Sequence, residues 1–311
     1  MGARVAISTI SNDIRAASLR TLLGTGRLCR IIEVHSPLAG IIAEHARGGA
    51  ANERNFDGFW SSSLTDSALR GLPDSEVLNT HLRLAWIDAI FSVTTKPLVM
   101  DGDTGGSPSH FSHAVQVMER GGVSAVVIED KTGDKRNSLL PGDSLHQMAP
   151  VEDFCAKIAA GKAAQVGVDF MIFARLEGLI AGLSTEEVVA RADAYVRAGA
   201  DGVVVHSRSS DAALVIDLAQ RIRAIHPQVP LVAIPTAYPS ITEDELAAAG
   251  FNLVIYANQM LRSSVKAMEE VSHRILDSAR ALEAEDVCIR TAQILSMRDD
   301  ETPLVRVRTE R

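Results

Sequence analysis

The chain has 311 residues, 46% of them hydrophobic, and a formal net charge of −8. This composition suits a globular protein with a large core, and the negative charge argues against a general nucleic-acid binder, because phosphate contacts require dense Lys and Arg. No run approaches the roughly 18 apolar residues of a membrane span, and the first residues lack the apolar segment of a signal peptide.

Three cysteines, Cys29, Cys155 and Cys288, lie far apart in the sequence and form no CxxC pair. An odd number without a pairing pattern predicts a reducing compartment, with neither a disulfide framework nor a zinc knuckle. We therefore expect a cytoplasmic protein that binds neither membranes nor nucleic acids.

The first predicted element is a peripheral helix within residues 1–30, with Ser11 or Asn12 as its N-cap and Gly24 at its end. Eight short apolar runs then alternate with helical patterns. The apolar runs, which predict strands, cover 30–36, 56–63, 96–106, 125–128, 169–178, 201–209, 229–239 and 252–259. Helices are predicted between them at 37–49, 75–94, 110–122, 149–167, 184–200, 212–227 and 242–250, and after them at 261–283 and 286–297. Ser184 and Glu187 form a capping box.

The alternation of continuous apolar strands with helices indicates a parallel sheet with helices outside it. Eight such units predict a closed (β/α)8 barrel of TIM type over about 30–260, followed by a C-terminal helical extension over about 261–298 and a charged tail at 299–311. The whole chain, 1–311, is expected to form a single domain. A doubly wound open sheet is the alternative, but no G-x-G-x-x-G follows the first strand and no P-loop occurs.

Each of the eight predicted strands ends in polar residues. In barrels of this type the active site forms at the carboxyl ends of the strands. Polar residues on all eight strands are hard to explain by solvation alone, so we expect a catalytic barrel mouth, with a barrel that only binds a ligand as the alternative. The residues at these ends are His35–Ser36, Ser61–Ser63, Asp101, Asp103, Glu129, Arg175, Glu177, His206–Arg208, Thr236 and Asn258.

Three of these end residues are acids that favour a metal site. Asp101 and Asp103 are two positions apart, so on an extended strand they project to the same side, and Glu129 ends the neighbouring strand. Oxygen donors without Cys and with few His suit Mg²⁺, or Mn²⁺, rather than zinc. The alternative is a loop cap with a structural ion pair.

A basic loop follows Glu129 directly and carries Lys135 and Asn137. Such a loop can cover a site, exclude water and bring both side chains onto a charged reacting group, although a solvated surface loop has the same composition. Arg175 can hold a carboxylate or phosphate with two hydrogen bonds, and His206 adds a further donor to the same mouth.

At these residues the sequence resembles the phosphoenolpyruvate mutase branch of the isocitrate lyase superfamily, from about Arg30 to the C-terminal helices. The most specific element is Glu129-Asp130-Lys131, followed after five residues by Asn137-Ser138. Other residues fall in the family's order and close to its spacing: Trp60-Ser61-Ser62, Asp74, Asp101, Asp103, Arg175 and His206. The resemblance implies a (β/α)8 barrel and the interconversion of phosphoenolpyruvate and phosphonopyruvate in phosphonate biosynthesis.

The resemblance also implies a Mg²⁺ site with unequal ligands. Asp101 would anchor the ion, while Asp74, Asp103 and Glu129 would act mostly through water bound to it. Asp74 is in this way included among the catalytic residues.

For the substrate, the resemblance implies that Trp60 lines the site and that the backbone amides of Ser62 and Ser63 hold the pyruvoyl oxygens together with the metal. Ser63 departs from the family, which often has glycine at this position. Arg175 and His206 would bind the phosphoryl group.

The loop would contribute Asn137, which stays with the migrating phosphoryl group, and Lys135, which steadies the closed loop. Lyases of the superfamily use a cysteine in this loop, and residues 132–138 contain none, so carbon–carbon lyase activity is not expected. Phosphonopyruvate hydrolases tend to lose the asparagine at position 137, so its presence favours the mutase over the hydrolase. The resemblance finally implies a homodimer or homotetramer in which the last helix is swapped between partners.

Overall fold

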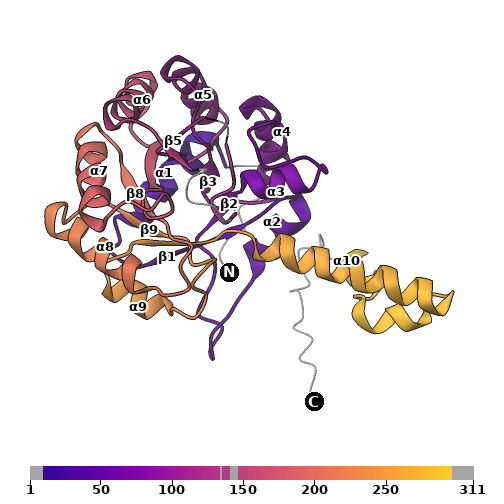
Figure 1. Cartoon of the computed structure of the whole chain (residues 1–311). Helices are drawn as coiled ribbons and strands as arrows, with labels where there is room; N and C mark the ends of the chain where they lie inside the picture. Colours follow the sequence, from indigo (N-terminus) through magenta and orange to yellow (C-terminus); the bar gives the residue numbers. More distant parts are fainter. Residues whose placement is uncertain (1–9, 134, 141–145, 296–311) are drawn as a thin grey trace.

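A computed structural model describes residues 10–133, 135–140 and 146–295. Eight parallel strands close into a barrel in the order β1–β10–β9–β8–β7–β4–β3–β2, and helices surround it (Figure 1). The strands are β1 (Cys29–Glu33), β2 (Gly58–Ser61), β3 (Leu98–Asp101), β4 (Ala125–Glu129), β7 (Met171–Leu176), β8 (Gly202–Val205), β9 (Leu231–Ala233) and β10 (Leu253–Tyr256). The predicted (β/α)8 barrel is confirmed.

The helices of the barrel are α1 (Asn12–Leu23), α2 (Pro37–His45), α3 (Ser63–Ala68), α4 (Thr80–Phe91), α5 (Pro108–Arg120), α6 (Val151–Ala164), α7 (Thr185–Arg197), α8 (Ala213–Ile225) and α9 (Glu243–Ala248). The C-terminal part comprises α10 (Gln259–Ser278), a 3₁₀ helix at Leu282–Val287 and α11 (Thr291–Leu295). A two-stranded antiparallel ladder, β5 (Lys131–Thr132) with β6 (Gln147–Met148), stands at the base of the loop after β4.

Capping explains several helix boundaries. The Ser11 hydroxyl accepts from Ile14 N at the start of α1, and the capping box of Ser184 with Glu187 opens α7, both as predicted. The helix predicted from residue 75 instead begins at Thr80, because Asn79 caps it. The short helix α3 was not predicted; Ser62 caps it directly after β2, so the second strand is shorter than expected.

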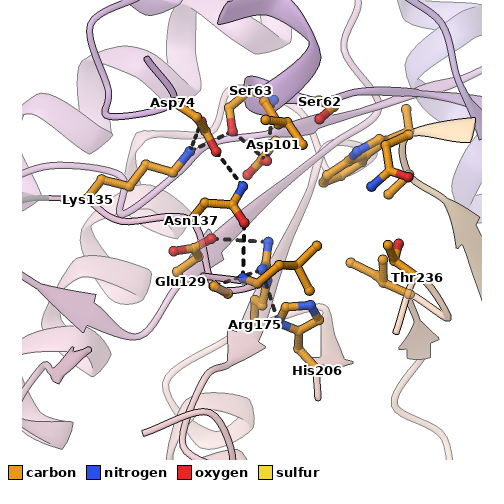
Figure 2. Close-up of a pocket in the computed structure, with 17 residues that line it drawn as sticks. Ser62, Ser63, Asp74, Asp101, Glu129, Lys135, Asn137, Arg175, His206 and Thr236 are labelled. Carbon is orange, nitrogen blue, oxygen red and sulfur yellow. Dashed lines mark hydrogen bonds and ion pairs between the residues drawn. The ribbon is translucent and has the colours of Figure 1, made fainter. Parts of the chain in front are cut away.

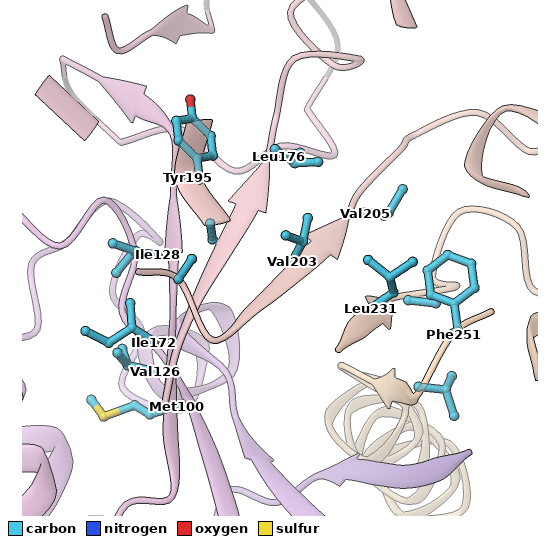
Figure 3. Packing of buried hydrophobic residues seen from close by; sticks show 14 of the residues in the cluster. Met100, Val126, Ile128, Ile172, Leu176, Tyr195, Val203, Val205, Leu231 and Phe251 are labelled. Carbon is cyan, nitrogen blue, oxygen red and sulfur yellow. The ribbon is translucent and has the colours of Figure 1, made fainter. Parts of the chain in front are cut away.

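The barrel has two apolar layers. One lies between the strands and the helices, where Figure 3 shows Ile128, Ile172 and Val203 packed on the outer side of the sheet. The other fills the barrel interior and includes Val127 and Phe173, which alternate with the outward-facing residues.

Helix α1 closes the amino-terminal end of the barrel, because Leu19 and Leu23 belong to the interior layer. Arg15 is buried beside them and donates to the carbonyls of Phe91, Thr94 and Lys96. In the described part of the chain the amino-terminal end of the barrel is therefore filled, and the polar residues that could meet a ligand lie at the opposite, carboxyl ends of the strands.

The C-terminal part differs from the prediction in its boundaries. Helix α10 ends at Ser278 rather than near residue 283. The next residue, Ala279, takes a left-handed conformation with φ 51° and so ends the helix. The second predicted helix, 286–297, is replaced over the described residues by the 3₁₀ helix and α11. The charged tail at 299–311 lies outside the described residues. In the part of the chain that the structure describes, no helix is both long and apolar enough to cross a membrane.

Candidate active site

A pocket of about 510 Å³ opens at the carboxyl ends of the strands. Of the residues to which the family resemblance gives a role, all but Asp103 line it, so the structure brings together side chains that are up to 146 positions apart, from Trp60 to His206. Among the other polar strand ends, Thr236 and Asn258 also line the pocket, whereas His35, Ser36, Ser61, Glu177, Ser207 and Arg208 do not. The lining residues are Trp60, Ser62, Ser63, Leu64, Asp74, Asp101, Glu129, Lys135, Asn137, Ser138, Leu139, Arg175, His206, Ile234, Thr236, Ala257 and Asn258. Figure 2 shows their arrangement.

One side of the pocket holds an acidic cluster around the Lys135 ammonium. Lys135 Nζ lies 2.6 Å from Asp74 Oδ1 and 2.6 Å from Ser63 Oγ, and it also contacts Asp103 Oδ1. The Ser63 hydroxyl donates in turn to Asp101 Oδ2 at 2.9 Å. The hydroxyl at this position, where the family often has glycine, is thus part of the cluster.

The sequence predicted Asp103 on an extended strand, and this prediction is wrong. Strand β3 ends at Asp101, and Asp103 has a left-handed φ of 55°. The turn directs the Asp103 carboxylate toward the Lys135 ammonium, which Asp74 also contacts. Asp101 and Asp103 therefore face the same cluster from different directions.

The charges in the cluster separate the two aspartates. Burial alone would raise the pKa of Asp101, but the charges of Lys135, Arg175 and Arg83 outweigh it and lower that pKa. For Asp103, burial and the neighbouring Asp101 charge raise the pKa. Of these two aspartates, Asp101 therefore keeps its negative charge more readily, as a direct ligand of a cation must.

The opposite corner of the pocket holds a buried network around Arg175. Strand pairing places Arg175 beside Glu129, and Nη1 lies 3.1 Å from Glu129 Oε1. Glu177, fully buried behind the pocket, approaches Arg175 Nε at 2.5 Å and His206 Nδ1 at 3.0 Å. Glu177 thus orients both side chains that were predicted to bind a phosphoryl group.

The same network sets the protonation states of this corner. Burial, reinforced by the Arg175 charge, lowers the pKa of His206, so the imidazole is neutral near pH 7 despite its carboxylate partner. Burial would lower the pKa of Arg175, but Glu177, Glu129 and Asp101 raise it. The corner therefore offers one permanent cation and one neutral imidazole to an anionic group.

The loop after β4 reaches over the pocket and is tied to it at several points. Asn137 Nδ2 donates to Asp74 Oδ2 at 2.7 Å, as Figure 2 shows. Lys131, fully enclosed at the loop base, donates to Arg136 O at 3.0 Å and to Ser138 Oγ at 2.9 Å, and it pairs with Glu129 at 2.7 Å. The described loop residues thus occupy a closed position over the site.

No pattern in the sequence indicates a role for Arg83, which the structure places behind the acids. Arg83 extends from α4 and is 3% exposed. Its guanidinium donates to Asp101 O, to Ser61 O at 3.0 Å and to Asp66 Oδ2 at 2.8 Å. By bonding the carbonyls at the ends of β2 and β3, it fixes the backbone that carries Asp101. An arginine inside a predicted amphipathic helix does not distinguish this role from an exposed one.

The residues fit a hard cation held mainly by one side chain. The donors are carboxylates, which Mg²⁺ and Mn²⁺ prefer. The Lys135 ammonium forms ion pairs with Asp74 and Asp103, so these carboxylates already surround a positive charge. Among the described residues no three His, Cys, Asp or Glu side chains converge as ligands of one ion. A cation bound here would therefore take most of its ligands from water, as Mg²⁺ usually does.

Comparisons with known proteins agree with this geometry. The family model described as phosphoenolpyruvate phosphomutase matches residues 19–276. The chain belongs to this family. A crystal structure of phosphoenolpyruvate phosphomutase from Streptomyces platensis subsp. rosaceus is 38% identical, with a TM-score of 0.84 over 91% of this chain and 95% of that one.

Two further comparisons involve a related activity. A phosphonopyruvate hydrolase from Variovorax sp. (strain Pal2) is 36% identical over 286 residues, which are 91% of this chain and 94% of the hydrolase. A phosphonopyruvate hydrolase solved in complex with oxalate and Mg²⁺ is 34% identical, with a TM-score of 0.80 over 92% of this chain and 95% of that one. The predicted family and enzymatic nature are confirmed, and the mutase relatives support the isomerase class. Similarity at this level does not separate the mutase from the hydrolase.

Proposed function

We propose that this enzyme interconverts phosphoenolpyruvate and phosphonopyruvate by moving a phosphoryl group within one substrate molecule. The observation that carries the proposal is Asn137, whose amide reaches into the pocket from the closed loop. In the direction toward phosphoenolpyruvate, the P–C bond breaks, its electrons form the enol double bond, and a P–O bond forms at the enolate oxygen. No water enters this exchange, so a closed loop favours it.

The residues divide the work between the two ends of the substrate. Arg175 and the neutral His206, both held by Glu177, bind the phosphoryl group. The backbone amides of Ser62 and Ser63 hold the pyruvoyl oxygens. Phosphoryl transfer of this loose kind needs positioning and charge stabilisation more than covalent help.

We assign Mg²⁺ as the cofactor, with Mn²⁺ as a substitute. Asp101 would hold it directly, and Asp74, Asp103 and Glu129 would hold its water ligands. When bound, Mg²⁺ would supply positive charge to the oxygens of the pyruvoyl unit. The hydrolase solved with oxalate and Mg²⁺ supports this assignment.

Incubation of the enzyme with phosphonopyruvate and Mg²⁺ is expected to give phosphoenolpyruvate as the main product in ³¹P NMR spectra. The physical reason is that the closed loop keeps water from the phosphoryl group. Inorganic phosphate and pyruvate as the main products would instead support a phosphonopyruvate hydrolase, which the 36% identity to the Variovorax enzyme makes the second candidate. Binding of phosphonopyruvate without either product would indicate a barrel that only binds anions.

We also propose that α10 mediates a homodimer or homotetramer through helix exchange. Figure 1 shows α10 extending away from the barrel, and Leu261 is its one buried residue. Val265, Met268 and Ile275 continue a stripe from Leu261 at helical spacing, and they are 43%, 57% and 40% exposed. An apolar stripe of this kind needs a partner surface.

The double substitution Val265→Glu and Met268→Glu is expected to convert the oligomer into monomers, because two charges would be buried in the contact. Light scattering coupled to size-exclusion chromatography measures the mass. Lys266→Glu, which changes the charge of an exposed residue on the same helix, is the matched control and should leave the mass unchanged. A wild-type chain that elutes as a monomer would contradict the proposal.

A further inference from the structure

The predicted site residues leave one arc of the barrel mouth without a role. They come from β2, β3, β4, β7 and β8 and from the segments that follow these strands. The strands β9 and β10 stand next to β8 in the barrel. The segments after them contribute Ile234, Thr236, Ala257 and Asn258 to the pocket wall.

This arc carries two buried oxygen atoms without hydrogen-bond partners. They are Thr236 Oγ1 and Asn258 Oδ1, and the whole Asn258 residue is 5% exposed. Glu129 Oε2 and Arg175 Nε also lack hydrogen bonds, but each has an ion-pair partner, at 2.7 Å and 2.5 Å. A buried polar atom without any partner is costly, and these two oxygens belong to residues that line the pocket, so they indicate contacts with a molecule bound there.

The position of the arc indicates which part of a substrate it meets. Thr236 follows β9, which pairs with β8, and His206 directly follows β8. Figure 2 shows Thr236 on the other side of the pocket from Asp74, Lys135 and Asn137. Thr236 therefore continues the wall formed by Arg175 and His206 rather than the acidic cluster, whereas Asn258 follows β10, which stands between β9 and β1.

We propose that Thr236 is a substrate-binding residue that donates a hydrogen bond to a phosphoryl oxygen, opposite the loop. This inference rests on the proposed function for the identity of the phosphoryl group. A threonine hydroxyl can donate as well as accept. This donor is neutral, and it adds a directional contact to a site that already holds the Arg175 cation.

The inference is tested with two inert ligands in the presence of Mg²⁺. 3-Phosphonopropionate carries a phosphonate group and a carboxylate, whereas oxalate has no phosphoryl group. Thr236→Val is expected to raise the Kd of phosphonopropionate about 10-fold, the effect of losing a hydrogen bond to a charged group. The Kd of this variant for oxalate should change less than about 2-fold, and titration calorimetry measures both constants.

Two further variants separate binding from folding. Tyr238→Phe removes a buried hydroxyl from the same segment that does not line the pocket, and it should leave both constants unchanged. Thr236→Ser keeps a hydroxyl and should restore phosphonopropionate binding. The proposal is overturned if both ligands weaken equally, if neither changes, or if the wild type does not bind phosphonopropionate. Binding as expected without any turnover of phosphonopyruvate would refute the proposed function and leave this subsite intact.

Discussion

Asp101→Ala is expected to lower turnover of phosphonopyruvate by about 1000-fold or more, equivalent to about 4 kcal/mol of transition-state stabilisation. The charges of Lys135, Arg175 and Arg83 lower the pKa of Asp101. Its Oδ2 accepts from the Ser63 hydroxyl. Without the Asp101 carboxylate, no other acid of the cluster is placed to bind the cation directly.

The barrel is expected to stay folded in this variant, because Lys135 keeps its contacts with Asp74 and Asp103. Circular dichroism and thermal unfolding measure the fold, steady-state rates measure turnover, and calorimetry with Mg²⁺ measures the loss of cation binding. Asp57→Asn is the matched control. Asp57 is also buried but pairs with Arg27 away from the pocket, so this change should affect stability and leave kcat unaltered. An Asp101→Ala enzyme with wild-type turnover would refute the metal assignment.

The barrel could be predicted because the apolar pattern that marks each of its strands is local in the sequence. Each buried parallel strand is a continuous apolar run, and the register of such runs brings their polar ends to one rim. Glu129 and Arg175 illustrate this point, since pairing of β4 with β7 places them side by side although 46 positions separate them in the sequence. Most of the candidate site follows from that rule.

The remaining features depend on contacts that no local pattern encodes. The left-handed turn at Asp103 changes the direction of its carboxylate, and a two-residue spacing alone suggested an extended strand. Arg83 acts through carbonyl groups at the ends of two other strands. Helix α3 begins at Ser63, which the prediction had placed at the end of the second strand. These features arise from tertiary packing between elements, so they become visible only when the three-dimensional structure is known.

Asn137 is the residue that most directly separates the two candidate reactions. Its amide is held at both ends, since Nδ2 donates to Asp74 and Oδ1 accepts from Leu139 N at 3.0 Å. It therefore joins the closed loop to the rim of the pocket. A side chain too short to make these contacts would leave a polar gap beside the phosphoryl group, large enough for water.

Asn137→Ala is therefore expected to lower formation of phosphoenolpyruvate about 100-fold, as loss of one positioned donor does elsewhere, and to shift the products toward inorganic phosphate and pyruvate. ³¹P NMR of the reaction mixture gives both products in one spectrum. Arg136→Ala is the matched control, because the Arg136 side chain is exposed and only its carbonyl is bonded to Lys131. It should keep the product ratio of the wild type. If Asn137→Ala also keeps that ratio and rate, Asn137 does not protect the phosphoryl group, and exclusion of water must come from the rest of the loop, through the bonds that Lys131 makes to Arg136 and Ser138.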